Sequence, residues 1–241
     1  MSINGYKYTG APTRNPFRYA LAVWRLISRP SDDAITDEAA IVEIGFARSG
    51  FGRRMARWDE LLTHLRQDPA MAETIERRAC IGPINLEELE KLPAGSLGRE
   101  FADHCRSRGI DPNLVHIAPE DEESWLLNHL FETHDIWHVV TGWPNDGRGE
   151  VGLAGFYCGQ LHSPAFFAFM LSLVILKTVW RKESTSQLFD AFVSGYRDGQ
   201  RTLPLFGTAW NEFWQEPLVA VRARFDYSPS EDGYGLSSQA A

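Results

Sequence analysis

The segment His134–His138 (HDIWH) holds the side chains best suited to chemistry in this chain. His134 and His138 are four residues apart, so on a helix their imidazoles lie on one face. At about 100° per residue, Asp135 lies about 60° from His138, and the three side chains share an arc of about 100°. Two imidazoles and a carboxylate on one arc suit a divalent transition metal. The pattern is similar to the H-E-x-x-H zinc helix, with Asp in the second place.

Glu150 is a further candidate ligand, on the next predicted helix. Gly142 is expected to end the first helix one turn beyond His138, and the loop WPNDGR then reverses the chain. In an antiparallel pair, the last turn of one helix faces the first turn of the next, where Glu150 falls. The two histidines and one or both carboxylates are therefore expected to bind one divalent metal per chain, with water in the open positions. Zinc, iron, magnesium and manganese all remain candidates.

The elements that position these residues are predicted to be helices. Apolar residues recur at spacings of three and four, and strand-like alternation between turn dipeptides is missing. We predict an all-α, single multi-helix domain over residues 13–226, between a flexible N-terminus (1–12) and a flexible tail (227–241). Helices are expected at Pro16–Ser28, 36–50, Gly52–Arg66, Ala70–Arg78, Leu86–Lys91, 96–109, 119–142, Gly149–Leu161, from Ser163 onward, Ser186–Arg201 and Pro217–Phe225.

Glycines mark one of these helices as closely packed. Gly152, Gly155 and Gly159 weaken the intrinsic helix propensity of the segment Gly149–Leu161. Their spacing of three and four residues predicts a stripe on which the backbone of a neighbouring element lies very near.

Composition excludes several classes of protein. The 241 residues carry a net charge of −8, which argues against nucleic-acid binding. Three widely spaced cysteines without a C-x-x-C pair favour a reducing cytoplasm. The longest apolar run, Ala165–Leu176, is shorter than the roughly 20 residues that span a bilayer. No secretory signal pattern is visible at the N-terminus.

Three blocks of the sequence resemble one known family. The first block resembles the H-D-x-x-H-x11-E signature of the fourth coenzyme Q biosynthesis protein (CoQ-four) family. It consists of His134–His138, eleven further residues and then Glu150. Leu92–Pro112 (LPAGSLGREFADHCRSRGIDP) is similar to its L-P-x-G-[ST]-L-G block. Gly199–Arg222 resembles its P-L-F-G-x-x-W block, followed by W-x-x-P-L-x-x-x-R. The resemblance covers about Ala79–Phe225, whereas the first 75 residues share only their helical pattern.

The resemblance implies a metal at the His/Asp/His/Glu motif and binding of a prenylated quinone precursor. It also implies oxidative decarboxylation, in which a hydroxyl replaces the C1 carboxyl of a polyprenyl-benzoate head group. The alternative is a non-catalytic prenyl-lipid-binding scaffold that organises the other quinone-biosynthesis enzymes at the membrane. A third interpretation, an HD-type phosphohydrolase, would need further ligands, for which His116 and His162 are the available histidines.

An isoprenoid tail needs an apolar groove, and we expect it on the helix that follows Ser163. The candidate groove residues are Phe166, Phe169, Met170 and Leu173, with an ordinary core helix as the alternative. A stripe of Arg18, Arg25 and Arg29 could lie on an anionic membrane surface. We expect a bacterial, cytoplasmic protein, with peripheral contact at the inner face of the plasma membrane and a homodimer as further possibilities.

Overall fold

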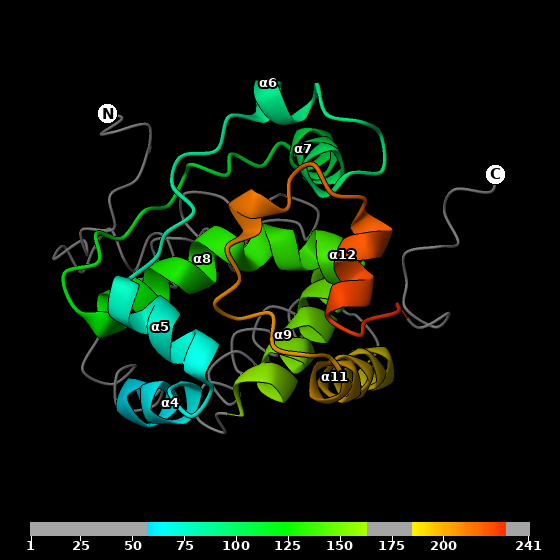
Figure 1. Cartoon of the computed structure of the whole chain (residues 1–241). Coiled ribbons are helices and arrows are strands. Elements are labelled where there is room, and N and C mark those ends of the chain that lie inside the picture. Colours follow the sequence, from blue (N-terminus) through cyan, green and yellow to red (C-terminus); the bar gives the residue numbers. More distant parts are fainter. Residues whose placement is uncertain (1–56, 163–184, 230–241) are drawn as a thin grey trace, which may run out of the picture.

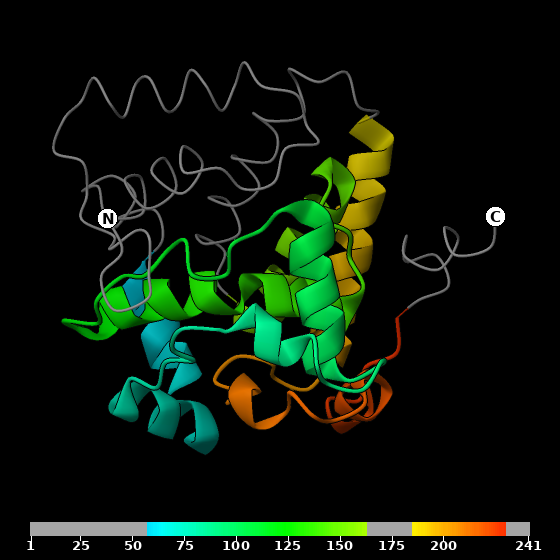
Figure 2. The same ribbon diagram turned by 90° about the horizontal axis from the view of Figure 1, so that it is seen from above.

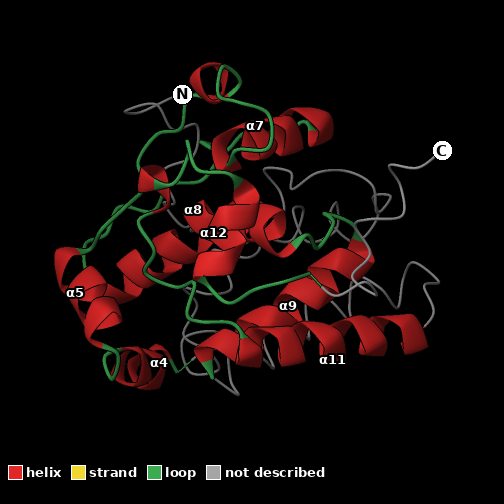
Figure 3. Cartoon of the chain, turned by 45° about the vertical axis from the view of Figure 1, so that its right-hand side comes forward, coloured by secondary structure: helices red, strands yellow, loops and turns green. Residues whose placement is uncertain are grey.

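The computed structural model describes residues 57–162 and 185–229, which form helices joined by loops (Figure 1, Figure 3). These ranges contain no β-strand, and the nearest approach to one is an isolated antiparallel bridge between Ser96 and Pro217. The prediction of a single all-α domain is therefore confirmed for this part of the chain. The helices are α4 (Trp58–Leu65), α5 (Pro69–Arg77), α6 (Leu86–Leu89), α7 (Leu97–Arg108), α8 (Glu122–Thr141), α9 (Gly147–Leu161), α11 (Thr185–Arg201), the 3-10 helix η1 (Trp210–Glu212) and α12 (Leu218–Arg224).

Local capping signals set the ends of α7 and α8. The Ser96 side chain accepts from the backbone N–H of Arg99, as expected of an N-cap, and Gly109 ends α7 in the left-handed region at φ 67°. Gly142 ends α8 at φ 78°, also as predicted. The predicted start of α8 was too early: Asp121 forms a capping box with Ser124, so the helix begins at Glu122.

The glycine stripe of α9 packs against α11, and the two helices lie side by side in Figure 3. A Cβ built on Gly155 would lie 2.2 Å from the carbonyl oxygen of Phe192, and one on Gly159 would lie 2.4 Å from that of Tyr196. Gly152 instead makes room for the indole of Trp143, 2.3 Å from such a Cβ. The predicted close approach of a neighbouring backbone is thus confirmed at Gly155 and Gly159, while Gly152 admits a side chain.

Gln160 fixes the chain as it leaves α11. Its amide donates to the carbonyls of Gly199 and Thr202 at 2.8 and 3.0 Å, and its oxygen accepts from the backbone N–H of Leu205 at 2.8 Å. All three bonds are buried, so one side chain on α9 satisfies the backbone where the C-terminal segment turns away.

The C-terminal segment then joins α7 to α8. The backbone N–H of Leu97 donates to Glu216 at 2.8 Å, and that of Gly98 donates to Trp214 at 2.9 Å. Arg222 donates to the carbonyls of Val139 and Val140 at 3.0 and 2.8 Å, near the end of α8. In the view from above, η1 and α12 lie near the lower end of α7, on the same side of α8 (Figure 2). This segment therefore ties together the two helices that border the site described below.

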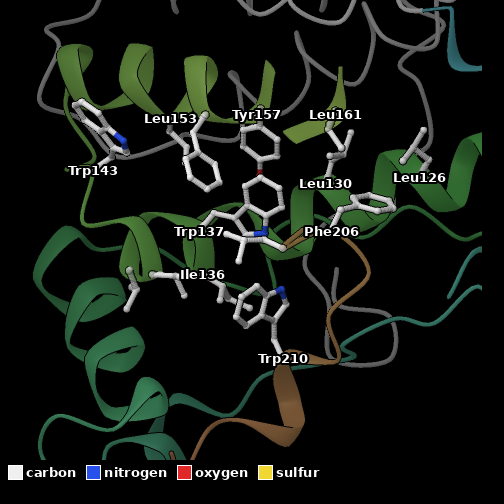
Figure 4. Packing of buried hydrophobic residues seen from close by; sticks show 14 of the residues in the cluster. Leu126, Leu130, Ile136, Trp137, Trp143, Leu153, Tyr157, Leu161, Phe206 and Trp210 are labelled. Carbon is white, nitrogen blue, oxygen red and sulfur yellow. The ribbon is translucent and has the colours of Figure 1, made fainter. Parts of the chain in front are cut away.

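Aromatic side chains fill the core between α8, α9 and the C-terminal segment (Figure 4). The Trp137 indole stacks on the Tyr157 ring at 4.2 Å between centroids, with 10° between the planes. Phe156 meets the same indole edge-on at 5.7 Å. Trp137, inside the HDIWH segment, is therefore buried against α9 and anchors this part of α8.

Several predictions fall outside the described residues. These are the helices at Pro16–Ser28 and 36–50, the apolar helix with its groove residues, and the arginine stripe. The domain bounds at 13 and 226 also stay predictions. Among the described helices, none combines the length and apolar character needed to cross a membrane.

Candidate metal centre

His134, His138 and Glu150 meet where α8 ends and α9 begins. The Nε2 atoms of the two histidines are 3.2 Å apart. Glu150 lies 3.4 Å from His138 through Oε1 and 3.5 Å from His134 through Oε2. The three residues form the candidate metal cluster of the described part of the chain.

The distances between these ligand atoms suit one ion. A tetrahedral site with bonds of about 2.0–2.1 Å has ligand–ligand edges of about 3.3–3.4 Å. The observed 3.2, 3.4 and 3.5 Å lie close to those edges. Two imidazoles and one carboxylate occur both in zinc sites with an open fourth position and in facial iron(II) sites. The donor set therefore fits a divalent metal and leaves room for a further ligand.

His138 is held in the form that a metal needs. Its Nδ1 donates to the carbonyl of Trp143 at 2.8 Å, which places the ring proton on Nδ1 and leaves the Nε2 lone pair facing the cluster. The side chain is completely buried. The WPNDGR loop thus orients the ring as well as reversing the chain.

Glu150 is ionised within this cluster. Burial raises the pKa of a carboxyl group, but here the electrostatic effect of the adjacent imidazoles of His138 and His134 outweighs it and holds the pKa of Glu150 well below its usual value. The helix dipole acts in the same direction, because Glu150 is in the first turn of α9. A carboxylate held negative against two imidazoles is ready to bind a cation.

Asp135 lies beside the cluster rather than within it. Its Oδ1 faces Nε2 of His104 on α7 at 3.7 Å, and each side chain is 16% exposed. Burial opposes ionisation of Asp135, but the nearby imidazoles of His104, His134 and His138 outweigh it and keep its pKa lowered. The structure therefore brings three of the four predicted ligands together, and direct coordination by Asp135 stays a prediction.

His104 was missed by the sequence reasoning. Its ring stacks beside that of His138, with centroids 5.9 Å apart and 21° between the planes. A local signal did exist, since His104 follows the buried Leu97 and Phe101 by seven and three residues and so lies on the inward side of α7. The other histidines considered, His116 and His162, are not part of the described cluster.

These features define a class: a helical protein whose candidate metal centre joins the end of one helix to the start of the next. The family profile described as Coenzyme Q (ubiquinone) biosynthesis protein Coq4 matches residues 47–230. The chain belongs to this family, which acts in ubiquinone biosynthesis.

Individual relatives agree with the family assignment. The chain is 25% identical over 175 residues to the ubiquinone biosynthesis protein COQ4 homolog of Rattus norvegicus, covering 70% of this chain and 65% of that protein. It is 28% identical over 173 residues to the human homolog, covering 67% and 62%. The match thus spans less than two thirds of either relative, both of which are named as mitochondrial.

A solved structure also resembles this fold. The crystal structure of a proposed ubiquinone biosynthesis protein from Nostoc punctiforme matches with a TM-score of 0.65 and 26% sequence identity. The alignment covers 88% of this chain and 98% of that one. The similarity therefore extends over most of both chains rather than over one motif.

Proposed function

We propose that the chain is a metal-dependent enzyme of ubiquinone or related prenylquinone biosynthesis, which replaces the C1 carboxyl of a polyprenyl-benzoate head group by a hydroxyl. Membership of the family supports the pathway. The observation that supports a metal enzyme is the buried cluster of His134, His138 and Glu150, whose spacing suits one ion with an open position.

The proposed reaction has a defined balance. The bond between the ring carbon and the carboxyl carbon breaks, and the carboxyl group leaves as CO₂. The same ring carbon gains one oxygen atom from O₂. The second oxygen atom is reduced to water with two protons and two electrons from an external donor. A bound metal would supply either a Lewis-acid anchor for the head group or, as iron(II), redox chemistry, because zinc has none.

The protein's own residues have three tasks in this scheme. The two imidazoles and Glu150 would hold the ion, and Trp143 O keeps His138 in the tautomer that leaves Nε2 free to bind it. The buried rings of Trp137 and Tyr157, of which Tyr157 stacks on His134, would exclude water from the inner side of the site. We further propose that the isoprenoid tail binds the apolar segment that follows Ser163, where the sequence predicts a helix with a groove, and that the protein contacts the membrane and its partner enzymes peripherally.

The first experiment measures metal content by mass spectrometry, on protein purified without chelator or added metal. We expect about one metal per chain in the wild type and its loss in His138→Ala. His162→Asn is the matched control, because His162 is exposed, has φ 48°, and is outside the cluster. Asparagine tolerates that backbone conformation. If the wild type and His138→Ala contain and take up equal amounts of metal, the site is wrong.

A second measurement separates the enzyme from the scaffold. A polyprenyl-benzoate labelled in the carboxyl carbon is supplied with O₂ and a reductant, and release of labelled CO₂ is followed. The enzyme releases label in the wild type but not in His138→Ala. A protein that binds metal and prenylated substrate but releases no label would instead be the scaffold.

A further inference from the structure

His104 reaches the candidate metal centre from a third helix. It lies on α7, thirty-one residues before Asp135, whereas the cluster residues come from α8 and α9. Its Nε2 is 3.7 Å from Oδ1 of Asp135, and its ring lies beside that of His138. The His104 side chain thus lies beside one ligand, His138, and beside Asp135, which is next to the ligand set on α8.

The two facing atoms are buried and incompletely satisfied. Nε2 of His104 and Oδ1 of Asp135 are shielded from solvent, and neither has a hydrogen-bond partner among the described residues. A buried donor or acceptor without a partner is destabilising, so two such atoms that face each other favour a hydrogen bond between them. Their separation exceeds hydrogen-bond length by less than 1 Å, and a small shift of either side chain closes it.

The contact matters because Asp135 and His138 share one arc of α8. A hydrogen bond from His104 to Oδ1 fixes the plane of the carboxylate and leaves Oδ2 for the cluster side. The stacked ring limits the rotation of His138 about its side-chain bonds, while Trp143 O fixes its tautomer from the other edge. Partners of this kind typically change metal affinity by 10–100-fold, because they hold the ligands in binding geometry.

We propose that His104 is a positioning residue of the metal centre, which orients Asp135 through its Nε2–H and His138 through ring stacking. The proposal rests on the metal site proposed above. It assigns to α7 a role in metal binding, in addition to its packing against α8.

Metal affinity and Co²⁺ absorption test this role without relying on activity. His104→Phe keeps an aromatic face but removes the N–H. His104→Gln places an amide N–H near the position of Nε2, whereas the shorter His104→Asn does not reach it. Zn²⁺ affinity is measured by competition with a chromophoric chelator, and the d–d bands of bound Co²⁺ report the coordination geometry. His64→Phe is the control, because His64 lies far from the metal centre along α8. It is on α4, whose C-terminal end pairs with the start of α8 through Arg66 and Glu122, whereas the metal centre is near the end of α8.

We expect His104→Phe and His104→Asn to bind Zn²⁺ about 10–100-fold more weakly than the wild type, with altered Co²⁺ bands. His104→Gln should recover most of the affinity, and His64→Phe should match the wild type. Circular dichroism identifies any variant that fails to fold; if His104→Phe fails, the Gln and Asn pair still decides the question.

Two results would overturn the proposal, and they are distinguishable. If His138→Ala loses the metal but the folded His104 variants keep wild-type affinity and Co²⁺ bands, only the role of His104 is wrong. If His138→Ala also binds metal like the wild type, the metal site itself is wrong, and the role of His104 falls with it.

Discussion

Replacing Gly155 with alanine is expected to destabilise the protein by separating α9 from α11. The added Cβ would lie 2.2 Å from the carbonyl oxygen of Phe192 and 3.0 Å from the backbone nitrogen of Tyr196. Ordinary contact begins at 3.4 Å, so the two backbones would have to move apart by about 1.2 Å in a closely packed interior. Both atoms belong to the backbone of a helix and cannot rotate away as a side chain does.

The magnitude follows from two opposing effects. Alanine improves helix propensity over glycine by about 1 kcal/mol. Overpacking of a well-packed interior costs about 1–3 kcal/mol, and a clash with backbone belongs at the upper end of that range. The free energy of unfolding should therefore fall by about 1–2 kcal/mol, which corresponds to a decrease in Tm of about 2–8 °C for a chain of this size.

Chemical and thermal denaturation of the metal-free protein measure this change. Gly98→Ala is the graded control, because its Cβ would meet a methyl group of Leu92 at 2.6 Å, which can rotate, and the carbonyl of Trp214 at 2.9 Å. Gly98→Ala should therefore cost less than Gly155→Ala. A Gly155→Ala protein as stable as the wild type would refute the argument that backbone contact sets the distance between these helices.

Three further predictions follow from single side chains. Arg222→Met should lower the free energy of unfolding by about 2–4 kcal/mol, because two charge-assisted hydrogen bonds to the end of α8 are lost; Arg222→Lys should lose less, and equal losses would contradict the bidentate role. The pKa of Glu150 is lower in the folded protein than in the unfolded chain, so its carboxylate stabilises the fold above the unfolded pKa of about 4.3. This stabilisation is lost as the pH falls through the folded pKa. In denaturation of the metal-free protein, the wild type should therefore lose its advantage over Glu150→Gln in acid, and a constant difference would argue against this. Burial and Glu132 raise the pKa of Cys80 to about 11, so its alkylation by iodoacetamide should accelerate up to about pH 11, and a plateau near pH 8.5 would contradict this.

Local sequence determined much of the frame around the site. The spacing of His134 and His138 placed both imidazoles on one face of α8, and Gly142 ended that helix as predicted. Glu150 fell in the first turn of α9 and reaches both histidines. These features depend on interactions within a turn or two of helix, or on a short loop, and residue types alone report such interactions well.

Other features were decided only by packing between distant segments. Asp135 shares the arc of His138, yet its Oδ1 faces α7, because His104 occupies that side of the helix. The anchoring of α8 by Arg222 joins residues more than eighty positions apart. Neither contact can be predicted from the periodicity of the sequence, because each residue fits the pattern of its own helix regardless of which residue of another helix it contacts. Spacing therefore determined which side chains share a face, and only the tertiary structure decided which faces meet.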